Sequence, residues 1–182
     1  MDVIVSTDRL LIHEWRAEDR APFAALNGDP EVMQHFPSTL TRAESDAAVD
    51  ALQDRFVRDG LCFWPVSERG GPFVGMVGLQ VVDFDVSGLE GSVEIGWRLL
   101  RPYWGRGYAT EAARGCLEHG FVAHGLDEIV AFTTHGNHAS RRVMERLGMV
   151  RDPQGDFDHP RVAIGDPLRP HVLYRARSAQ RG

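Results

Sequence analysis

Two glycines one residue apart, Gly105 and Gly107, interrupt the stretch RPYWGRGYATEA just where an alanine-rich helical pattern begins. The backbone N–H groups of a helix's first turn have no partner inside the helix, and the helix dipole adds about half a positive charge there. Because glycine lets a ligand approach the backbone closely, this loop meets the conditions for holding a diphosphate. The same residues also fit an ordinary glycine turn before a surface helix, so the loop alone leaves both interpretations open.

The common nucleotide-binding motifs do not fit this loop. All 20 basic residues are arginine, so the chain lacks the lysine of a Walker A loop and any lysine nucleophile. The dinucleotide-binding fingerprint needs a third glycine in the loop and an acidic residue at the end of the next strand. Thr110 stands in place of the third glycine, and the next apolar run ends in Thr133, Thr134 and His135. Both motifs are therefore excluded.

The elements around the loop are predicted from their periodicity. Residues 93–99 alternate as a strand, with Val93, Ile95, Trp97 and Leu99 on one face and Glu94, Gly96 and Arg98 on the other. A buried helical stripe starts at Ala109, a short strand covers Glu128–Thr133, and a second helix runs from an Asn137 N-cap to Gly148. The order strand, helix, strand predicts that the two strands are parallel and joined by a right-handed crossover.

The rest of the chain completes a mixed sheet. We expect a strand at Arg9–Trp15, a helix stopped near Asn27, and a second helix between a Thr41 and Glu44 capping box and Gly60. Residues 61–68 and 72–84 read as a hairpin, and further strands are expected near Phe157 and over His171–Ala176. The fold class is α+β, and the length predicts one domain over residues 1–182.

Composition excludes several classes of protein. A net charge of -6 argues against nucleic acid as a partner, and no apolar run is long enough for a membrane helix. The first residues lack the basic and small-residue pattern of a signal peptide, so a cytoplasmic location is expected. Cys62 and Cys116 lie in apolar settings, where we expect no disulfide.

The loop and the Asn137 helix together resemble a known family. EIGWRLLRPYWGRGYATEA followed by NHASRRVMERLGM is similar to the acetyl-CoA signature of the GCN5-related N-acetyltransferases (GNAT), in the branch that resembles ribosomal-protein N-terminal acetyltransferases. The resemblance implies a mostly antiparallel sheet of about six to seven strands with a splayed parallel pair, flanked by about four helices. Trp104 departs from the family loop, which commonly has Gln or Arg at that position.

The resemblance also implies where acetyl-CoA binds as co-substrate. Its pyrophosphate would lie against the backbone N–H groups of the loop, and its pantetheine arm would run beside the backbone of the strand before it. The implied cofactor-binding residues are Trp97, Leu99, Trp104, Gly105, Arg106, Gly107, Tyr108, Ala109, Thr110 and Asn137. Arg106 is the preferred arginine for a phosphate, although an exposed arginine can equally be solvated.

Three residues are candidates for catalysis. Glu94 is the expected base for the amine, directly or through water, and its alternative is a paired or solvated strand carboxylate. Asn137 is implied to bind pantetheine or acceptor, and it can also act only as a helix cap. Ser140 would protonate the thiolate, because no tyrosine stands at the place that is usual in the family. His135 and His138 lack a third ligand, so no metal is expected.

The expected activity is acetyl transfer from acetyl-CoA to a primary amine by direct attack on the thioester. The acceptor would be a small molecule or a protein N-terminus, bordered by residues 34–40 and 158–171. A non-catalytic acyl-CoA-binding or regulatory module of the same fold, and a donor with a longer acyl chain, stay open as alternatives. Analogy with the family allows a homodimer.

Overall fold

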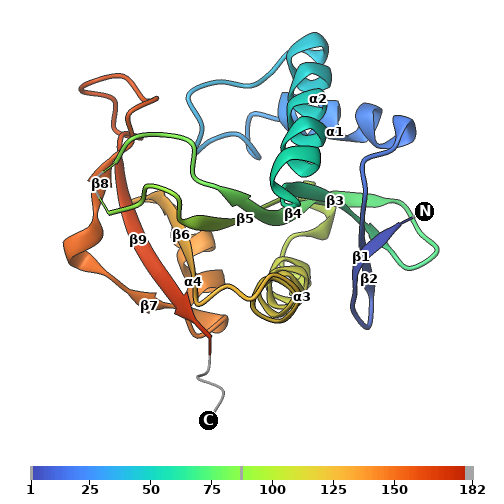
Figure 1. Cartoon of the computed structure of the whole chain (residues 1–182). Helices are drawn as coiled ribbons and strands as arrows, with labels where there is room; N and C mark the ends of the chain where they lie inside the picture. The colour runs from blue at the N-terminus through green and yellow to red at the C-terminus, as the bar shows by residue number, and fades with distance from the viewer. Residues whose placement is uncertain (1, 87, 179–182) are drawn as a thin grey trace.

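The computed structural model describes residues 2–86 and 88–178. Within these described residues, four α-helices and nine strands form the fold (Figure 1). The helices are α1 (Arg20–Gly28), α2 (Arg42–Asp59), α3 (Tyr108–Ala123) and α4 (His138–Arg146), and short 3-10 turns cover Ala17–Asp19, Arg101–Tyr103 and Pro153–Gly155. The strands are β1 (Val3–Ser6), β2 (Leu10–His13), β3 (Phe63–Glu68), β4 (Phe73–Val81), β5 (Val93–Leu99), β6 (Glu128–Thr134), β7 (Val150–Arg151), β8 (Phe157–Asp158) and β9 (Pro170–Arg177).

All nine strands join one mixed sheet. Their order is β1-β2-β3-β4-β5-β6-β9-β7, with β8 pairing β9 beside this path. Every neighbouring pair is antiparallel except β5 and β6, which are parallel as the strand, helix, strand order predicts. Because β7 and β8 have two residues each, seven strands are longer, which agrees with the expected number. The N-terminal strand β1 was not expected from the sequence.

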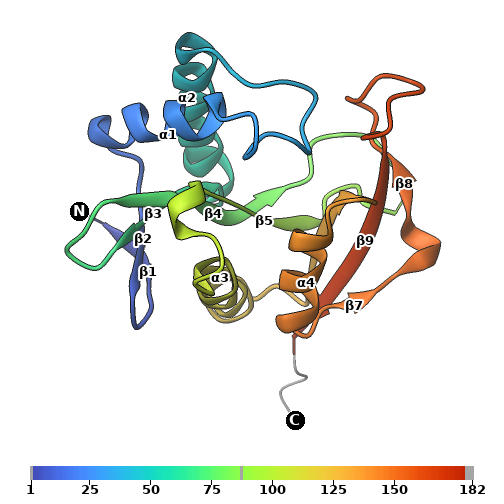
Figure 2. The ribbon, with the colours of Figure 1, turned by 180° about the vertical axis from the view of Figure 1, so that it is seen from behind.

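Helices cover both faces of the sheet. Figure 1 shows α1 and α2 on one side and α3 and α4 on the other, and the turned view of Figure 2 agrees. The α3 face is closely packed, because a Cβ placed on Gly120 of α3 would lie 2.7 Å from a methyl group of Leu79 on β4. Odd-numbered residues of β4 and β5 therefore face α3, and even-numbered ones face α1 and α2.

No helix in residues 2–86 and 88–178 is long and apolar enough to cross a membrane.

The local signals in the sequence fix the helix ends. The Thr41 hydroxyl accepts a hydrogen bond from the Glu44 backbone N–H, and the Glu44 carboxylate accepts one from the Thr41 backbone N–H, which is the expected capping box. Gly60 ends α2 with φ at +70°, a conformation that glycine adopts without strain. Asn137 caps α4 as expected. Cys62 and Cys116 are buried free thiols.

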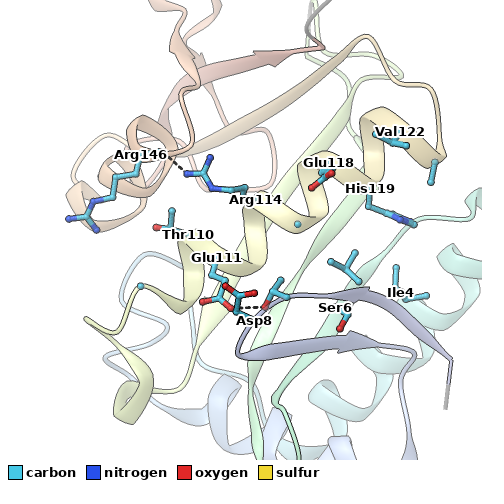
Figure 3. Close-up of a pocket in the computed structure, with 15 residues that line it drawn as sticks. Ile4, Ser6, Asp8, Thr110, Glu111, Arg114, Glu118, His119, Val122 and Arg146 are labelled. Carbon is cyan, nitrogen blue, oxygen red and sulfur yellow. Dashed lines mark hydrogen bonds between the residues drawn. The ribbon is translucent and has the colours of Figure 1, made fainter. Parts of the chain in front are cut away.

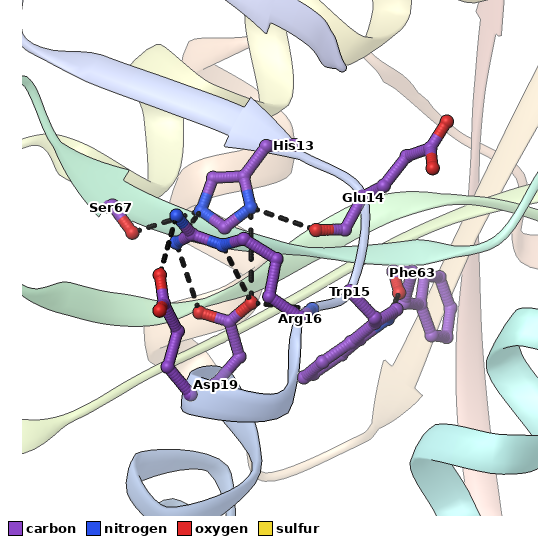
Figure 4. Close-up of polar contacts among 8 residues, drawn as sticks. His13, Glu14, Trp15, Arg16, Asp19, Phe63 and Ser67 are labelled. Atoms are coloured by element: carbon purple, nitrogen blue, oxygen red, sulfur yellow. Dashed lines mark hydrogen bonds and ion pairs between the residues drawn. The ribbon is translucent and has the colours of Figure 1, made fainter. Parts of the chain in front are cut away.

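A buried polar cluster connects β2 to the start of α1 (Figure 4). The His13 ring lies 3.0 Å from the Ser67 hydroxyl and 2.9 Å from the Glu14 carbonyl oxygen. Arg16 forms an ion pair with the buried Asp19 carboxylate at 3.2 Å. Next to the cluster, the Trp15 indole donates a 2.8 Å hydrogen bond to the Phe63 carbonyl oxygen. These contacts hold α1 against β3 on the α1 and α2 face.

Candidate functional site

The site is built around the point where β5 and β6 separate. Their parallel pairing consists of a single register pair, Glu94 with Val130, whereas β5 pairs with β4 from Val93 to Leu99. Just outside β5, the Leu100 N–H donates a hydrogen bond to the Val74 carbonyl oxygen, and the Ser92 carbonyl oxygen accepts one from the Val82 N–H. Because backbone hydrogen bonds alternate along an antiparallel pair, the even-numbered residues of β5 direct their N–H and C=O groups toward β4. The backbone groups of Trp97 and Leu99 therefore point to the other edge, where β6 has already parted. An extended ligand can use such an edge as it would use a strand.

Trp104 bonds to one of these groups. Its indole N–H donates a 2.8 Å hydrogen bond to the Leu99 carbonyl oxygen, while 44% of the Trp104 residue stays exposed. The bond ties the loop that follows β5 back to the last residue of the strand. This contact gives a physical reason for a tryptophan at the position where the family commonly has Gln or Arg. No local pattern in the sequence predicted the contact.

The glycine loop has the conformation that an anion site requires. Gly105 and Gly107 have φ of +74° and +79°, and Gly107 is the N-cap of α3. Residues with side chains rarely adopt this conformation, so the backbone itself requires glycine here. A Cβ on Gly105 would meet no atom of the described residues within 4 Å, and one on Gly107 would be 3.6 Å from the Arg9 guanidinium. Gly105, Arg106 and Gly107 are exposed, so the loop that leads into α3 is accessible to a diphosphate.

Side chains around the loop hold it in place. The Tyr108 hydroxyl donates a 2.6 Å hydrogen bond to Glu68, and the Arg9 guanidinium stacks on the Tyr108 ring at 4.6 Å. Arg9 also donates to the Arg106 carbonyl oxygen at 3.1 Å and pairs with Glu111 of α3. The Tyr108 side chain is therefore an anchor of the loop. The exposed Arg106 side chain, which lies over the Tyr103 ring, is accessible to a ligand.

Glu94 lies where the two strands begin to separate. The residue is 9% exposed, and its carboxylate accepts a 2.7 Å hydrogen bond from Gln80 directly across on β4. Burial raises the pKa of Glu94 to about 7, and the Gln80 bond opposes this shift. A carboxylate with a pKa near neutrality can take a proton from an amine and release it again.

Asn137 and Ser140 lie together at the start of α4. The Asn137 side-chain oxygen accepts from the Ser140 backbone N–H at 3.1 Å, and its amide donates to the Thr133 hydroxyl at 2.9 Å. Capping is thus one role of Asn137, and the second bond orients its amide against the end of β6. Both residues are half-buried. Contact of either residue with a ligand stays a prediction.

Two further polar residues border the α1 and α2 face of the site. Arg98 of β5 lies against the loop after α1, with Nη1 2.8 Å from the Met33 sulfur. His35 of the same loop has Nδ1 3.4 Å from the Thr134 hydroxyl at the end of β6. The alternation of residues along the strand predicted that Arg98 and Glu94 share a face, whereas no pattern in the sequence predicted that His35 lies next to Thr134.

Two cavities lie outside the separation of β5 and β6. One of about 780 Å³ runs along α3 beside the β1 and β2 hairpin (Figure 3). It reaches the glycine loop at Gly107 and Thr110, and its lining carries both signs of charge, with Glu111 and Glu118 beside Arg114 and Arg146. The other, of about 340 Å³, includes Asp158 and His171 from the predicted acceptor border. In the described part of the chain, no three His, Cys, Asp or Glu side chains are grouped as metal ligands.

Comparisons with known proteins show the family to which the chain belongs. A family model described as "Acetyltransferase (GNAT) domain" matches residues 9–150. The Bacillus subtilis protein named "Uncharacterized N-acetyltransferase YnaD" is 33% identical over 148 residues, which cover 81% of this chain and 83% of that protein. The chain belongs to the GNAT acetyltransferases and is an N-acetyltransferase.

Solved structures share the fold over nearly the whole chain. A GNAT-family acetyltransferase from Bacillus anthracis superposes with a TM-score of 0.76 at 26% identity, over 95% of this chain and 97% of that one. The ribosomal-protein α-N-acetyltransferase RimL in complex with coenzyme A has a TM-score of 0.77 at 13% identity, over 97% and 98% of the two chains. The expected GNAT fold is confirmed, and RimL shares this fold.

Proposed function

We propose that the protein transfers an acetyl group from acetyl-CoA to a primary amine by direct attack of the amine on the thioester. The observation that carries the proposal is the position of Glu94. A buried carboxylate with a pKa near neutrality lies at the residue of β5 that pairs with β6, beside an open strand edge that leads to the glycine loop. This combination supports a catalyst over a module that only binds acyl-CoA, because binding needs the edge and the loop but no base.

The residues present fit acetyl-CoA as donor. The N–H groups of the loop, Gly105 to Thr110, suit the diphosphate, and Arg106 adds an accessible positive charge. The outward backbone groups of Trp97 suit the amides of the pantetheine arm, while the Leu99 carbonyl is already bonded to Trp104. When bound, acetyl-CoA supplies an acetyl group activated as a thioester.

The chain's own side chains would move the protons. An alkyl ammonium group has a pKa near 10.4, so Glu94 in its ionised form would accept the proton that the amine must lose. The new C–N bond forms as the C–S bond breaks, and the thiolate takes up one proton. Ser140 is our candidate for donating that proton, and Asn137, fixed by Thr133 and the Ser140 backbone, is our candidate for orienting the reactants.

The acceptor would lie on the α1 and α2 face. The loop that carries His35 and the segment 158–171 border this face, in line with the sequence prediction. RimL, whose fold is similar, is described as acting on a ribosomal protein's α-amino group. For this chain we propose a small-molecule amine or a protein N-terminus, a cytoplasmic location, and a possible homodimer.

The test is release of free thiol from acetyl-CoA in the presence of a panel of amines and N-terminal peptides. At least one acceptor should raise thiol release above hydrolysis and should appear as the N-acetyl product by mass spectrometry. Propionyl-CoA and butyryl-CoA in competition identify the donor. Tight acetyl-CoA binding with no turnover for any acceptor, and an acetyl-CoA affinity that Glu94→Gln leaves unchanged, would instead establish a binding module.

A further inference from the structure

We propose that the amine acceptor is a small molecule that also carries a carboxylate, and that Arg98 binds this carboxylate. The inference rests on the acetyltransferase function proposed above and names the substrate class of that site. It starts from the half-buried guanidinium group of Arg98, which lies among apolar side chains and has no carboxylate partner in residues 2–86 and 88–178.

The surroundings of Arg98 are apolar. Its guanidinium carbon lies 4.8 Å from the centre of the Phe36 ring and 5.8 Å from that of Phe23, and Nη1 contacts the Met33 sulfur. Its Nε is inaccessible to solvent and has no hydrogen-bond partner in residues 2–86 and 88–178. Burial lowers the pKa of Arg98 to about 10, which leaves the group charged at neutral pH.

Other partly buried arginines of the chain have carboxylate partners. Arg175 on β9 pairs with Glu128 and Asp152 at 2.6 and 2.7 Å, and Arg16 pairs with Asp19. Among the described residues, no carboxylate lies within 4 Å of the Arg98 guanidinium. A partly desolvated charge without a partner costs free energy, and a methionine or leucine would fill the same apolar space without this cost. A carboxylate on the substrate would supply the missing partner in bidentate geometry.

The position of Arg98 relative to Glu94 suits an acceptor with two ends. The two residues share a face of β5 and lie four residues apart, which is about 13 Å between their Cα atoms in an extended strand. Gly96 lies between them, and the Phe63 ring packs over it, because a Cβ there would be 2.9 Å from the ring edge. The Trp15 indole holds the Phe63 backbone in place (Figure 4). An amine at Glu94 and a carboxylate at Arg98 would thus be separated by an apolar segment lying on this ring.

The acetyl-CoA phosphates do not account for Arg98. The glycine loop comes after the end of β5, whereas the Arg98 side chain is enclosed by Phe23 of α1 and by Met33 and Phe36 of the next loop. Arg101, which is closer to the loop, already pairs with Asp29 and Glu31 at 2.7 Å. An anion that binds Arg98 would therefore lie on the acceptor side of the sheet.

The experiment compares acceptors in matched pairs. A series of ω-amino acids of increasing length is assayed against the corresponding carboxamides, with fixed acetyl-CoA and with concentrations corrected for the free-amine fraction. The wild-type protein should prefer the carboxylate member by at least about tenfold in kcat/KM at the best chain length, as expected for a charge-assisted contact. Arg98→Met should abolish this preference by raising KM for the carboxylate member only, and Arg98→Lys should keep part of it. The Kd for acetyl-CoA should not change in either variant.

Arg177→Met is the matched control, because Arg177 is an exposed arginine at the far end of β9, paired with Glu128. It should keep the wild-type preference. Arg98→Met should unfold at or above the wild-type temperature, because it removes an unpaired charge, and Arg98→Lys provides the comparison if the Met variant fails to fold.

Three results would overturn the inference while leaving the acetyltransferase function intact. They are acetylation of both members of every pair at equal rates, an Arg98→Met variant that loses activity equally with both members, and acetylation of N-terminal peptides but of no small amine. A raised Kd for acetyl-CoA in Arg98→Met would assign Arg98 to the donor and would also overturn it. Absence of turnover with every acceptor would overturn the proposed function itself, and the inference with it.

Discussion

Gln80 and Glu94 lie directly opposite each other on β4 and β5, and the Gln80 amide donates a 2.7 Å hydrogen bond to the Glu94 carboxylate. Burial of Glu94 favours its neutral form, whereas the bond from Gln80 favours the ionised form. Burial has the larger effect, so the pKa of Glu94 rises from 4.5 to about 7. The pair thus sets the proton affinity of the proposed base.

Replacing Glu94 by Gln should reduce kcat/KM by about a hundredfold, the usual contribution of a general base. In the wild-type protein, kcat/KM should rise with pH through about 7 as Glu94 loses its proton, and this limb should be absent in Glu94→Gln. Rates of thiol release between pH 5 and 9 measure both effects. Titration of the acceptor amine adds a separate limb at higher pH.

Gln80→Met is the control for this assignment. Because the Gln80 bond lowers the pKa of Glu94, its loss should move the limb to higher pH without abolishing activity. If kcat/KM still rises at the same pH in both Glu94→Gln and Gln80→Met, the titrating group is not Glu94.

The same pKa shift predicts a dependence of stability on pH. A carboxyl group whose pKa is higher in the folded state than in the unfolded state destabilises the fold as pH rises from 4.5 through about 7. Relative to the wild-type protein, Glu94→Gln should therefore gain about 2 to 3 kcal/mol in unfolding free energy between pH 5 and pH 8. Urea denaturation at the two pH values measures the difference. An equal difference at both values would contradict the raised pKa.

Gly107→Val should weaken acetyl-CoA binding at least about tenfold, because valine destabilises the left-handed conformation that directs the first N–H groups of α3. Gly70→Val is a matched control. Gly70 has φ of +67° in open space in the turn between β3 and β4, so the substitution imposes similar strain away from the loop. Both variants should lose about 1 to 2 kcal/mol of stability, but only Gly107→Val should lose affinity in calorimetric titration. Equal affinities would show that the loop does not bind the donor.

Asn137 can be tested for a role beyond capping. Asn137→Asp keeps an oxygen for the Ser140 N–H but loses the amide donor to Thr133, whereas Asn137→Ala loses both bonds. Asn137→Ala should cost about 1 kcal/mol of stability, and Asn137→Asp much less. If the amide orients the reactants, kcat should fall at least about tenfold in both variants. If kcat falls only in Asn137→Ala, the variant that loses stability, and not in Asn137→Asp, the role of Asn137 is capping.

The sequence by itself determined the elements whose signals are local. The alternation over Val93–Leu99, the Thr41 and Glu44 capping box, and the Asn137 cap each depend on residues within a few positions, and the structure has all three. The strand, helix, strand order further fixed the parallel pairing of β5 and β6, because a right-handed crossover is the favoured connection. Candidate residues of the glycine loop could be named for the same reason.

Only the tertiary structure decided how these elements form a site. The separation of β5 from β6 after one register pair depends on how the whole sheet twists and packs, as does the bond from Trp104 to Leu99. Burial by distant segments sets the pKa of Glu94 and leaves the Arg98 guanidinium without an anion. Solvent exposure and electrostatic interactions depend on residues that are close in space and far apart in sequence, which is why no local pattern could predict them.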